Sequence, residues 1–456
     1  MQDHIEALTA LLGETQLLTG QAIGEKYQVD WSGENPHLPQ LVVRPDSTAV
    51  VSQLLAYCNE HHIALVTQGG MTGLAGGATP RANEIALSLE RMNGIIELDH
   101  PSMTMTVKAG TPLQVIQQAA DAAGLRLPLD LGARGSCQIG GNVATNAGGN
   151  QVLSFGMARA LVLGLEAVQA DGTVISAHNK MLKNNAGYDL KQLFIGSEGT
   201  LGVITEVVLR LFPASRNKHT ALVSLGRFDE VIKLLHVAQA SFARLSAFEV
   251  MWDDYFLRAV AETDNTSDPF DKTYPYYVLL ESENDSLDRF QQVLFEQMEN
   301  GTLLDAAIAQ SGKDSDQFWA IRDAIGDLLS RIPDAANFDI GLPISRMQAF
   351  LEKAQTVLDE KFDHLHTITF GHLADGNIHV TAWTEGKNST QAIYKAVYEL
   401  LQAFEGTVTA EHGIGMMKTD YLKLCRSPEE IALMKTLKRA LDPNNILNPG
   451  RVIGPV

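Results

Sequence analysis

The stretch Gln68-Gly69-Gly70-Met71-Thr72-Gly73-Leu74-Ala75-Gly76-Gly77 decides the fold of the N-terminal half of this chain. It follows an apolar, β-branched run at residues 63–67, which follows a helical pattern over 48–61 with Asp46 or Ser47 as N-cap. The predicted order is therefore helix, strand and glycine loop. Because glycine has no Cβ, the N–H groups of such a loop can approach a diphosphate closely without help from lysine or arginine.

Two further loops rich in glycine and small polar residues follow, at residues 134–149 and 194–205. Each loop alone is more typical of a set of tight turns than of a cofactor site. Three in one region, with Ser136, Thr145 and Asn146 as extra donors, favour a large dinucleotide lying across them. No glycine trio has the G-x-G-x-x-G order between a strand and a helix, so the nicotinamide fingerprint is excluded.

A second informative stretch is Thr369-Phe370-Gly371-His372-Leu373-Ala374-Asp375-Gly376-Asn377-Ile378-His379-Val380. Apolar and β-branched residues on both sides of Asp-Gly predict a hairpin with a two-residue turn, in which His372 and His379 face each other. Opposed residues have Cβ atoms about 5 Å apart, close enough for two imidazoles to share a metal ion. Glu411 would complete a three-ligand set with an open position, which is typical of catalytic metal sites. The alternative is an ordinary pair of strand histidines.

Composition limits the class of protein. The net charge of −19 and the pI near 5.1 argue against binding to nucleic acid or to an anionic membrane surface. The three cysteines, Cys58, Cys137 and Cys425, are widely spaced and odd in number, which favours a reducing compartment and buried thiols. No apolar run reaches the roughly 20 residues of a membrane span, and residues 1–20 lack the lysine or arginine of a targeting peptide. We therefore expect a soluble, cytoplasmic protein.

Four regions follow from the pattern of helices, strands and loops. They are an N-terminal helical segment (1–35), a glycine-loop domain (36–214), a substrate domain with alternating strands, helices and acidic loops (215–410), and a C-terminal segment (411–456). Helical patterns cover residues 390–404 and 428–441 within the last two regions. Pro213 ends the strand that leaves the third glycine loop.

In combination, these motifs resemble the PCMH-type FAD-binding domain of the vanillyl-alcohol-oxidase superfamily and, more narrowly, the FAD-dependent D-2-hydroxyacid dehydrogenases. The resemblance covers residues 31–451. It implies an α+β fold, with a two-subdomain FAD-binding domain to which the C-terminal segment returns and a cap domain built on an antiparallel sheet. The motifs are Gly69–Gly73, Gly140–Gly149, Lys183–Leu190, Gly196–Gly202, Gly371–His379, Glu411–Gly413 and Asn448–Arg451.

The resemblance implies non-covalent FAD. Covalent members attach the flavin mainly through a histidine in the first loop, where this chain has Met71 and Thr72. Cys137 is a remote second candidate for attachment, but its apolar neighbour Ile139 and the family pattern favour a buried thiol there. The residues implied to bind FAD are Gly69, Gly70, Met71, Thr72, Gly73, Gly76, Gly77, Ser136, Gly140, Gly141, Thr145, Gly148, Ile204 and Asn448.

The resemblance also implies a divalent metal ion, Zn²⁺ or another such as Mn²⁺, bound by His372, His379 and Glu411. Its open position would take the substrate hydroxyl and one carboxylate oxygen, while hydride leaves the substrate for flavin N5. His412 would accept the hydroxyl proton, or else would only hydrogen-bond within the structure. Arg322 would bind the substrate carboxylate, or else would pair with Asp323 on a helix surface.

The expected reaction is oxidation of a D-2-hydroxyacid, such as D-2-hydroxyglutarate or D-lactate, to the 2-oxoacid. Electrons would pass to an electron-transfer flavoprotein, a quinone or a dye. Two alternatives stay open, an oxidase that uses O₂ and an FAD subunit of a multi-chain, glycolate-oxidase-like complex. The oligomeric state, including a homodimer, is open as well.

Three positions depart from the hydroxyglutarate branch. Gly326 stands where that branch has Thr, Asn337 where it has Lys, and Thr381 where it has Asn. These changes remove one cation and alter two polar contacts around the expected pocket, so the resemblance leaves the substrate side chain open. The missing charge would have to come from another residue, with Lys313, Arg331 and Arg346 as candidates.

Overall fold

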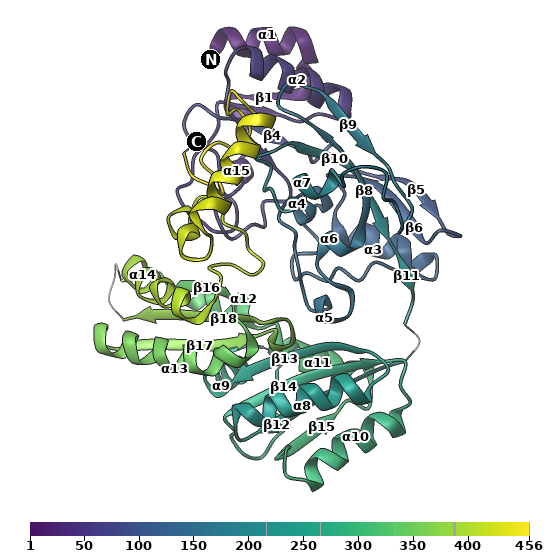
Figure 1. Ribbon diagram of the computed structural model, residues 1–456, viewed down its shortest axis with the longest axis vertical. Coiled ribbons are helices and arrows are strands. Elements are labelled where there is room, and N and C mark those ends of the chain that lie inside the picture. Colours follow the sequence, from purple (N-terminus) through teal and green to yellow (C-terminus); the bar gives the residue numbers. More distant parts are fainter. Residues whose placement is uncertain (216, 265, 333, 386–388, 456) are drawn as a thin grey trace. The chain divides into compact units, whose positions relative to one another are not determined.

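The computed structural model describes residues 1–215, 217–264, 266–332, 334–385 and 389–455. The chain divides into two compact units (Figure 1), each with a hydrophobic core of its own. The first unit comprises Met1–Gly149, Phe155–Ala214 and Glu411–Val456, and the second comprises Asn150–Ser154 and Ser215–Ala410. The chain therefore completes the second unit before it returns to the first.

The first unit begins with a four-stranded sheet in the order β1-β2-β4-β3. Strands β2 (Leu41–Val43), β4 (Ile85–Ser88) and β3 (Leu65–Gln68) run parallel, and β1 (Leu17–Thr19) pairs with β2 in the antiparallel sense. Helices α1 (Gln2–Leu12) and α2 (Thr48–Glu60) contact each other, and α2 begins where the sequence predicts. Strand β1 was not predicted, because three residues are too few to show an alternating pattern.

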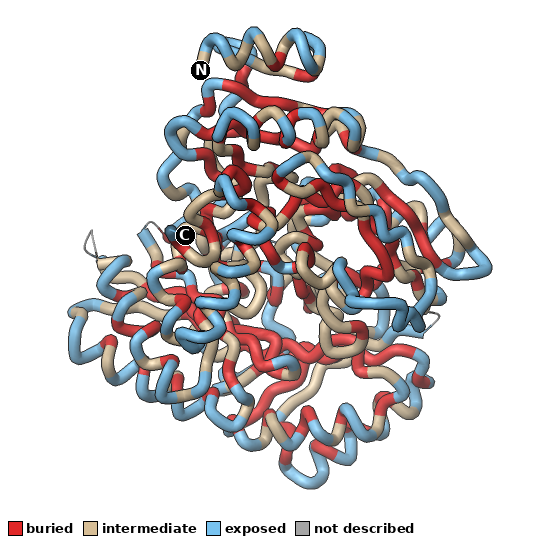
Figure 2. Tube along the Cα trace, turned by 45° about the horizontal axis from the view of Figure 1, so that its top comes forward, coloured by how far each residue is buried: buried red, intermediate tan, exposed pale blue. Residues whose placement is uncertain are grey.

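A five-stranded antiparallel sheet, β5-β6-β10-β8-β9, forms the rest of the framework of the first unit. Its three central strands, β6, β10 and β8, are buried in one hydrophobic core with α3, whereas the edge strands β5 and β9 are largely exposed. Buried segments of the chain are red in Figure 2. The elements are β5 (Ile95–Asp99), β6 (Thr104–Lys108), α3 (Leu113–Ala122), β7 (Leu125–Arg126), α4 (Ile139–Ala144), α6 (Ala158–Leu161), β8 (Val162–Val168), β9 (Val174–Ala177), α7 (Lys191–Phe194), β10 (Val203–Arg210), β11 (Phe212–Pro213) and α15 (Pro428–Leu441).

The second unit is built on a seven-stranded sheet in the order β15-β12-β14-β13-β17-β18-β16, in which every neighbouring pair of strands is antiparallel. The predicted α+β class with an antiparallel sheet is therefore confirmed. The strands are β12 (Lys218–Leu225), β13 (Leu245–Trp252), β14 (Tyr276–Glu283), β15 (Asp305–Ile308), β16 (Ala336–Gly341), β17 (Leu365–Gly371) and β18 (Asn377–Thr384). The helices are α8 (Phe228–Ser241), α9 (Asp253–Glu262), α10 (Leu287–Glu299), α11 (Gly312–Arg322), α12 (Ile325–Arg331), α13 (Ile344–Lys361) and α14 (Thr390–Leu401). The short helix α5 (Val152–Phe155) crosses the boundary between the two units, which lies after Ser154.

Helices cover both faces of this sheet. On one face, Met251 and Phe370 pack into a core with residues of α9, α11 and α12. On the other face, the ring of Phe338 packs against two tyrosines of α14. Strand register places Met251, Phe370 and His379 in one row across β13, β17 and β18, so His379 points to the face that α9, α11 and α12 cover.

The hairpin of β17 and β18 forms, but its predicted register is wrong. Phe370, not His372, is opposite His379, and His372 immediately precedes the 3₁₀ turn Leu373–Asp375. Of the two predicted turn residues only Gly376 has a positive φ, of +86°, whereas a two-residue type I′ turn requires positive φ at both. The loop is therefore longer than the sequence predicted, and His372 lies beyond the end of β17.

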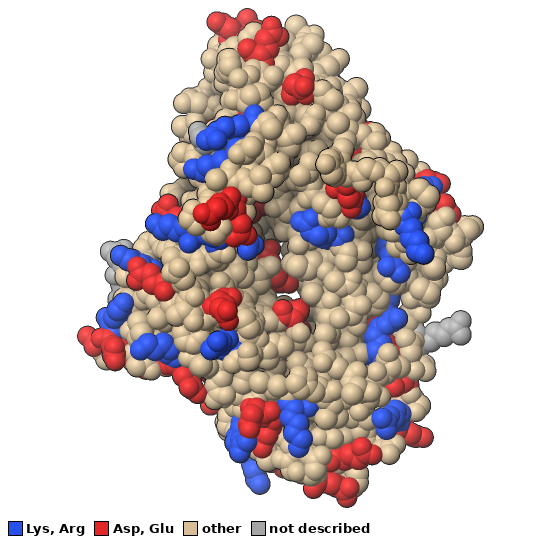
Figure 3. Space-filling view, in the orientation of Figure 1, with Lys and Arg blue, Asp and Glu red and all other residues tan. Residues whose placement is uncertain are grey.

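The described residues show no helix that is long and apolar enough to cross a bilayer. On the face drawn in Figure 3, basic and acidic side chains are interspersed. Of the cysteines, Cys58 and Cys137 are buried and Cys425 is partly exposed, and none of the three forms a disulfide. Burial raises the pKa of the Cys58 thiol to about 12, so the prediction of an inert core thiol is confirmed there.

Candidate active site

His372 and His379 lie together at the loop end of the β17–β18 hairpin. Their ring centroids are 5.5 Å apart and their ring planes are inclined by 83°. The ring of His379 also contacts Phe370, its cross-strand neighbour, at a centroid distance of 4.9 Å. The two imidazoles therefore meet even though their backbone positions are not opposite each other.

A buried carboxylate, that of Glu249 on β13, joins His372 to Arg322. Its Oε1 lies 2.7 Å from Nδ1 of His372, and its Oε2 accepts a hydrogen bond from Nε of Arg322 at 2.9 Å. The exposed fractions of Glu249, His372 and Arg322 are 2%, 5% and 8%. A carboxylate on Nδ1 favours the tautomer with its lone pair on Nε2, and Nη2 of Arg322 lies 3.1 Å from that atom. In this tautomer, Nε2 of His372 is an acceptor, either for Arg322 or for a ligand that takes its lone pair.

Arg322 ends helix α11, and its guanidinium is held from several sides. Nη1 donates to Oδ1 of Asp323 at 3.2 Å, and the guanidinium carbon lies 5.4 Å from the centroid of the Phe370 ring. The hydroxyl of Tyr255 donates to the backbone carbonyl of Arg322 at 2.6 Å, which fixes the end of the helix. The pair with Asp323 thus forms, but Arg322 is buried rather than on a helix surface.

The charges of this group stabilise one another. Burial alone would raise the pKa of Glu249, but its interactions with His372 and Arg322 outweigh burial and bring this pKa to about 2. Burial would lower the pKa of Arg322, but Glu249 and Asp323 outweigh it and raise this pKa above its ordinary value. Glu249 and Arg322 are therefore both ionised near neutral pH.

Asp339 on β16 lies on the Nδ1 side of His379, but farther from it than Glu249 lies from His372. Its Oδ1 lies 4.0 Å from Nδ1 of His379, its cross-strand neighbour, and accepts from the amide of Asn377 at 2.9 Å. Its Oδ2 accepts from the hydroxyl of Thr409 at 2.8 Å and from the N–H of Ala410 at 3.1 Å. Asp339 therefore holds the chain at the residue that immediately precedes Glu411.

The first glycine loop offers a row of backbone donors in the first unit. Among the described residues, no N–H group of residues 69–77 donates to another protein group, although Ala75 and Gly76 are buried. Met71 and Gly76 have positive φ angles of +58° and +71°, which turns successive N–H groups in the loop. Such an arrangement binds phosphate oxygens without a cationic side chain.

The second glycine loop packs against the first, backbone to backbone. A Cβ added at Gly70 would lie 2.0 Å from the carbonyl oxygen of Ser136, so only glycine fits there. A Cβ at Gly141 would have no atom within 4 Å, so open space lies beside it. Oε1 of Gln138 and Oδ1 of Asn142 are buried without a hydrogen-bond partner in the described chain. Unpaired donors, unpaired acceptors and open space together fit a large polar cofactor.

The predicted metal ligand Glu411 and the predicted base His412 belong to the first unit. The N–H of Gly149, which ends the second glycine loop, donates to Oε1 of Glu411 at 2.8 Å. After His412 the chain turns at Gly413, where φ is +80°. The carboxylate of Glu198, in the third glycine loop, accepts from the N–H groups of the next two residues. Burial raises the pKa of Glu198, and these N–H donors oppose that effect.

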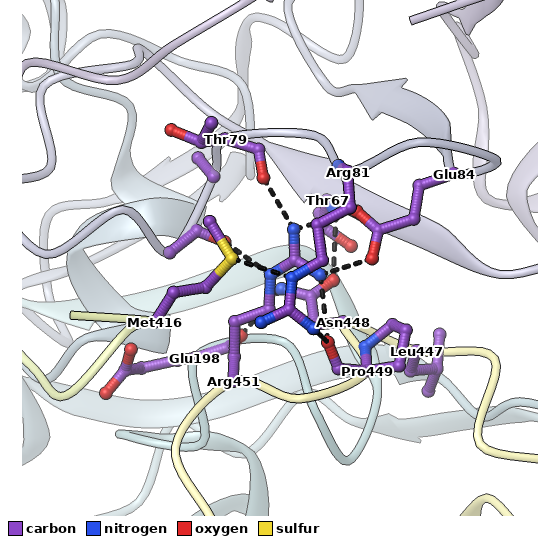
Figure 4. Close-up of polar contacts among 12 residues, drawn as sticks. Thr67, Thr79, Arg81, Glu84, Glu198, Met416, Leu447, Asn448, Pro449 and Arg451 are labelled. Atoms are coloured by element: carbon purple, nitrogen blue, oxygen red, sulfur yellow. Dashed lines mark hydrogen bonds and ion pairs between the residues drawn. The ribbon is translucent and has the colours of Figure 1, made fainter. Parts of the chain in front are cut away.

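The C-terminal segment joins the first and third glycine loops (Figure 4). Oδ1 of Asn448 accepts from the N–H of Thr67 at 2.9 Å, and its Nδ2 donates to the carbonyl oxygen of Glu198 at 2.8 Å. Arg451, only 1% exposed, donates to both carboxylate oxygens of Glu84 at 2.5 and 2.8 Å, and to the carbonyl of Thr79 at 2.5 Å. Asn448 therefore sits among the loop backbones, and Arg451 fixes the chain that follows the first loop.

The other sequence-predicted residues lie in different surroundings. Gly140 donates its N–H to Ala109 at 2.7 Å near the start of α4, and Thr145 caps the end of that helix through its hydroxyl. Gly148 is buried, Ser136 is exposed, and Ile204 is buried in the hydrophobic core on β10. Sequence reasoning missed Glu249, Asp339 and Glu198. For Glu249, the available signal is a lone carboxylate in the apolar strand Ala247-Phe248-Glu249-Val250-Met251.

Two family models match the chain. Residues 39–178 match the FAD binding domain, and residues 214–452 match the C-terminal domain of FAD linked oxidases. Curated relatives include D-2-hydroxyglutarate dehydrogenase of Xanthomonas citri pv. viticola, 37% identical over 98% of this chain and 96% of that protein. The chain belongs to the FAD-dependent D-2-hydroxyacid dehydrogenase family. It is an FAD-linked oxidoreductase, and its first unit contains the FAD-binding domain.

Other members of the family match over nearly the whole chain. D-2-hydroxyglutarate dehydrogenase of Stutzerimonas stutzeri is 35% identical, over 98% of both chains. The mitochondrial D-2-hydroxyglutarate dehydrogenase of Bos taurus is 37% identical, over 99% of this chain and 84% of that protein. Among solved structures, p-cresol methylhydroxylase with substrate bound has a TM-score of 0.77 at 17% identity, over 100% of this chain and 97% of the other. At that identity the likeness shows the fold alone.

Proposed function

We propose that this protein oxidises a D-2-hydroxyacid to the corresponding 2-oxoacid, with FAD as the hydride acceptor and with a divalent cation held by His372, His379 and Glu411. The observation that carries the proposal is the buried group of Glu249, His372 and Arg322 beside His379, because it combines a fixed imidazole with a cation suited to a carboxylate. The family and the names of the relatives support the reaction class.

Arg322 is the proposed partner of the substrate carboxylate. A guanidinium presents parallel donors that match the two oxygens of a carboxylate. Glu249 already occupies Nε of Arg322, and the Nη2 atom that lies near His372 is the one that would turn to substrate. A cation on Nε2 of His372 and a hydrogen bond from Arg322 to the same lone pair exclude each other, so metal binding would release this donor for the substrate.

The histidine pair fits a metal ion by its surroundings. Each imidazole has a carboxylate on its Nδ1 side, Glu249 at 2.7 Å from His372 and Asp339 at 4.0 Å from His379, so each ring would bind the ion through Nε2. Carboxylates in this position are typical of histidines that bind zinc, because they fix the tautomer and increase the basicity of the ligand. We propose Glu411 as the third ligand and Zn²⁺ as the ion, with Mn²⁺ as the alternative.

His412 is the proposed general base for the substrate hydroxyl. It is next to Glu411 in the chain, and the turn at Gly413 directs neighbouring side chains differently. The cofactors would supply the remaining chemistry, FAD as the hydride acceptor and the divalent cation as the Lewis acid toward the hydroxyl. The protein itself would then hold the substrate hydroxyl close to the imidazole of His412 while the α-hydrogen leaves.

FAD itself is proposed to lie along the glycine loops. The donors of residues 69–77 would bind its diphosphate, and the open space beside Gly141, with Gln138 and Asn142, would take polar groups of the rest of the molecule. Met71 and Thr72 replace the histidine that attaches flavin in covalent relatives, so we propose dissociable FAD. Ser136, Thr145, Gly148, Ile204 and Asn448 complete the proposed set.

The substrate side chain is the least constrained part of the proposal. Asn337 and Thr381 are cross-strand neighbours, and the hydroxyl of Thr381 donates to Oδ1 of Asn337 at 2.9 Å. This pair is neutral, so it offers no charge to a second carboxylate. We propose D-2-hydroxyglutarate first, after the named relatives, and a D-lactate-like acid second.

Anaerobic mixing of the purified flavoprotein with a panel of D- and L-2-hydroxyacids tests this proposal. We expect a D-acid to bleach the visible flavin band, a chelator to abolish bleaching and Zn²⁺ to restore it. No bleaching with any acid, despite bound FAD and metal, would exclude a stand-alone dehydrogenase and favour the subunit of a larger complex. Peroxide formation in air would favour the oxidase alternative over transfer to a flavoprotein, quinone or dye.

A cytoplasmic location stays a prediction from composition.

A further inference from the structure

Glu198 connects the third glycine loop to the turn that carries Glu411 and His412. Its Oε1 accepts from the N–H of Ile414 at 2.8 Å, and its Oε2 accepts from the N–H of Gly415 at 2.8 Å. Both carboxylate oxygens are therefore used by two successive backbone donors. A carboxylate that accepts from backbone N–H groups makes charge-assisted bonds, which are stronger than bonds between neutral groups.

The turn fits tightly around this carboxylate. A Cβ added at Gly413 would lie 2.8 Å from Oε1 of Glu198, and Gly413 has a positive φ of +80°. A Cβ added at Gly415 would lie 2.0 Å from the carbonyl oxygen of Ala75 in the first glycine loop. That carbonyl also accepts from the N–H of Met416 at 3.0 Å. The turn is thus held on one side by Glu198 and on the other by the first loop.

The backbone of Glu198 is itself anchored, so that its side chain is a rigid support. Its N–H donates to the carbonyl of Ala144, at the end of α4, at 2.8 Å. Its own carbonyl accepts from Nδ2 of Asn448 at 2.8 Å, as Figure 4 shows. Glu198 has a φ of +52°, a backbone conformation uncommon for residues with a side chain. The segment that carries the second glycine loop and the C-terminal segment therefore both fix the position of this residue.

We propose that Glu198 is a positioning residue, which holds Glu411 and His412 in place by fixing the turn that follows them. Its carboxylate links the third glycine loop to the turn after the two residues to which the proposed function gives roles in substrate oxidation. The catalytic part of this inference rests on the proposed function, because it assigns Glu411 to the metal and His412 to the proton. The structural part, the fixing of the turn, stands on the hydrogen bonds alone.

Glu198→Gln is the variant of choice, because the amide keeps the size of the side chain and leaves one acceptor oxygen for two N–H groups. We expect Ile414 and Gly415 to exchange their amide hydrogens at least about tenfold faster in the holoenzyme, since one charge-assisted bond is lost. We expect kcat to fall about 10- to 100-fold with a change in KM of less than about threefold, and metal affinity to fall about tenfold, as for other groups that orient ligands. FAD content stays unchanged.

Glu166→Gln is the matched control. Glu166 lies on β8 in the same unit, and its carboxylate accepts from the hydroxyls of Thr48 and Thr205 at 2.6 and 2.9 Å. Its substitution by glutamine likewise removes the charge of a carboxylate that accepts two hydrogen bonds, but its partners lie outside the turn. This control is expected to leave exchange at residues 414 and 415, metal affinity and kcat unchanged. A loss in both variants would show a general loss of stability and would overturn the positioning role.

A double-mutant cycle with Gly413→Ala keeps the inference testable if Glu198→Gln folds poorly. The new methyl group would meet Oε1 of Glu198, so Gly413→Ala is expected to destabilise the wild-type protein more than it destabilises Glu198→Ala, in which that oxygen is absent. The strain of the positive φ is the same in both backgrounds and cancels. Equal destabilisation in both backgrounds would overturn the contact on which the proposal rests.

A failure of the positioning role of Glu198 can be told apart from a failure of the proposed reaction. If Glu198→Gln speeds amide exchange in the turn while the wild-type flavin is not reduced by any hydroxyacid, the turn is positioned as proposed and the proposed reaction is wrong. If the wild type is active and Glu198→Gln changes exchange but leaves kcat and metal affinity intact, the residue is merely structural and the inference is overturned. If Glu198→Gln leaves amide hydrogen exchange at residues 414 and 415 unchanged, the positioning role is overturned directly.

Discussion

The two units differ in what they use for chemistry. In the first unit, the N–H groups of the first glycine loop donate to no protein group among the described residues, and glycines such as Gly70 let two loops approach without side chains between them. In the second unit, buried charged side chains, Glu249, Arg322 and Asp339, hold two imidazoles on a sheet. The comparison leads us to propose that cofactor binding depends on backbone shape, whereas substrate activation depends on fixed charge. The two properties should therefore respond to different substitutions.

The largest effect is expected for His379→Ala, which removes a proposed metal ligand from the second unit alone. We expect kcat/KM for the hydroxyacid to fall by at least about 10³-fold, because the proposed metal ion would stabilise the transition state by several kcal/mol as a Lewis acid. FAD content and the visible flavin spectrum should be unchanged. His366→Ala is the control, since His366 lies on the same hairpin, is more exposed and stacks on Trp383. A loss of flavin in His379→Ala would contradict the division between the units.

The second largest effect is expected for Glu249→Gln. The change leaves Arg322 buried beside a neutral amide and weakens the tautomer control of His372, so metal affinity should fall about 10- to 100-fold. The free energy of unfolding should fall by about 3 kcal/mol, since a buried ion pair loses one partner. Glu281→Gln is the control, because Glu281 is a buried carboxylate on the neighbouring strand β14 whose partners are Lys218, Ser246, Thr220 and Trp319. Equal losses of metal affinity in both variants would contradict a specific role of Glu249 in metal binding.

In the first unit, Gly70→Ala tests the backbone side of the comparison. The new methyl group would lie 2.0 Å from the carbonyl oxygen of Ser136, so the loops must separate. We expect the Kd for FAD to rise about 10- to 100-fold, in line with the 1 to 3 kcal/mol that overpacking costs. Metal affinity should not change. Gly132→Ala, where nothing lies within 4 Å of the new atom, should leave the FAD affinity as it is.

The sequence predicted those parts of the molecule that local pattern controls. Helices α2 and α15 begin at the expected residues, and α15 has a capping box of Ser427 and Glu430. The strands of the histidine hairpin were also found. Their register was not, because Asp375 does not adopt the positive φ that the predicted turn requires and the loop is longer.

The candidate site was only partly predictable, for a physical reason. Histidines and glycine loops are recognisable by residue type, whereas a supporting carboxylate is defined by residues far from it in the sequence. Glu249 meets Arg322 and His372 across 73 and 123 positions, and Glu198 meets Ile414 across 216. Such partners become visible only when the sheet order and the path of the chain are known.

A separate effect concerns the dependence of stability on pH. Burial raises the pKa of Asp254 to about 7, and Oδ1 of this residue accepts from the N–H groups of Thr369 and Tyr255 at 3.1 and 2.7 Å. A folded-state pKa above the unfolded value means that the folded protein retains a proton which the unfolded chain releases. Stability therefore falls as pH rises from about 4 to 7, by on the order of 2 to 4 kcal/mol.

Asp254→Asn keeps Oδ1 and removes the titration, so it should flatten the pH dependence of the free energy of unfolding in that window. Urea unfolding at pH 5 and pH 8 measures this. Asp253→Asn, at the exposed neighbouring position, should retain most of the wild-type slope, because burial raises the pKa of Asp254 more than the charge of Asp253 does. An unchanged slope in Asp254→Asn would show that another group controls it.

The most direct test of the division between the units is the flavin and metal content of one protein, His379→Ala, measured together by absorbance and elemental mass spectrometry. The account predicts about one FAD per chain and almost no bound zinc after both are supplied and excess is removed, with the wild type retaining both. Retained zinc would contradict the assignment of His379 as a ligand. Loss of both zinc and FAD would contradict the claim that backbone loops and buried charges act separately.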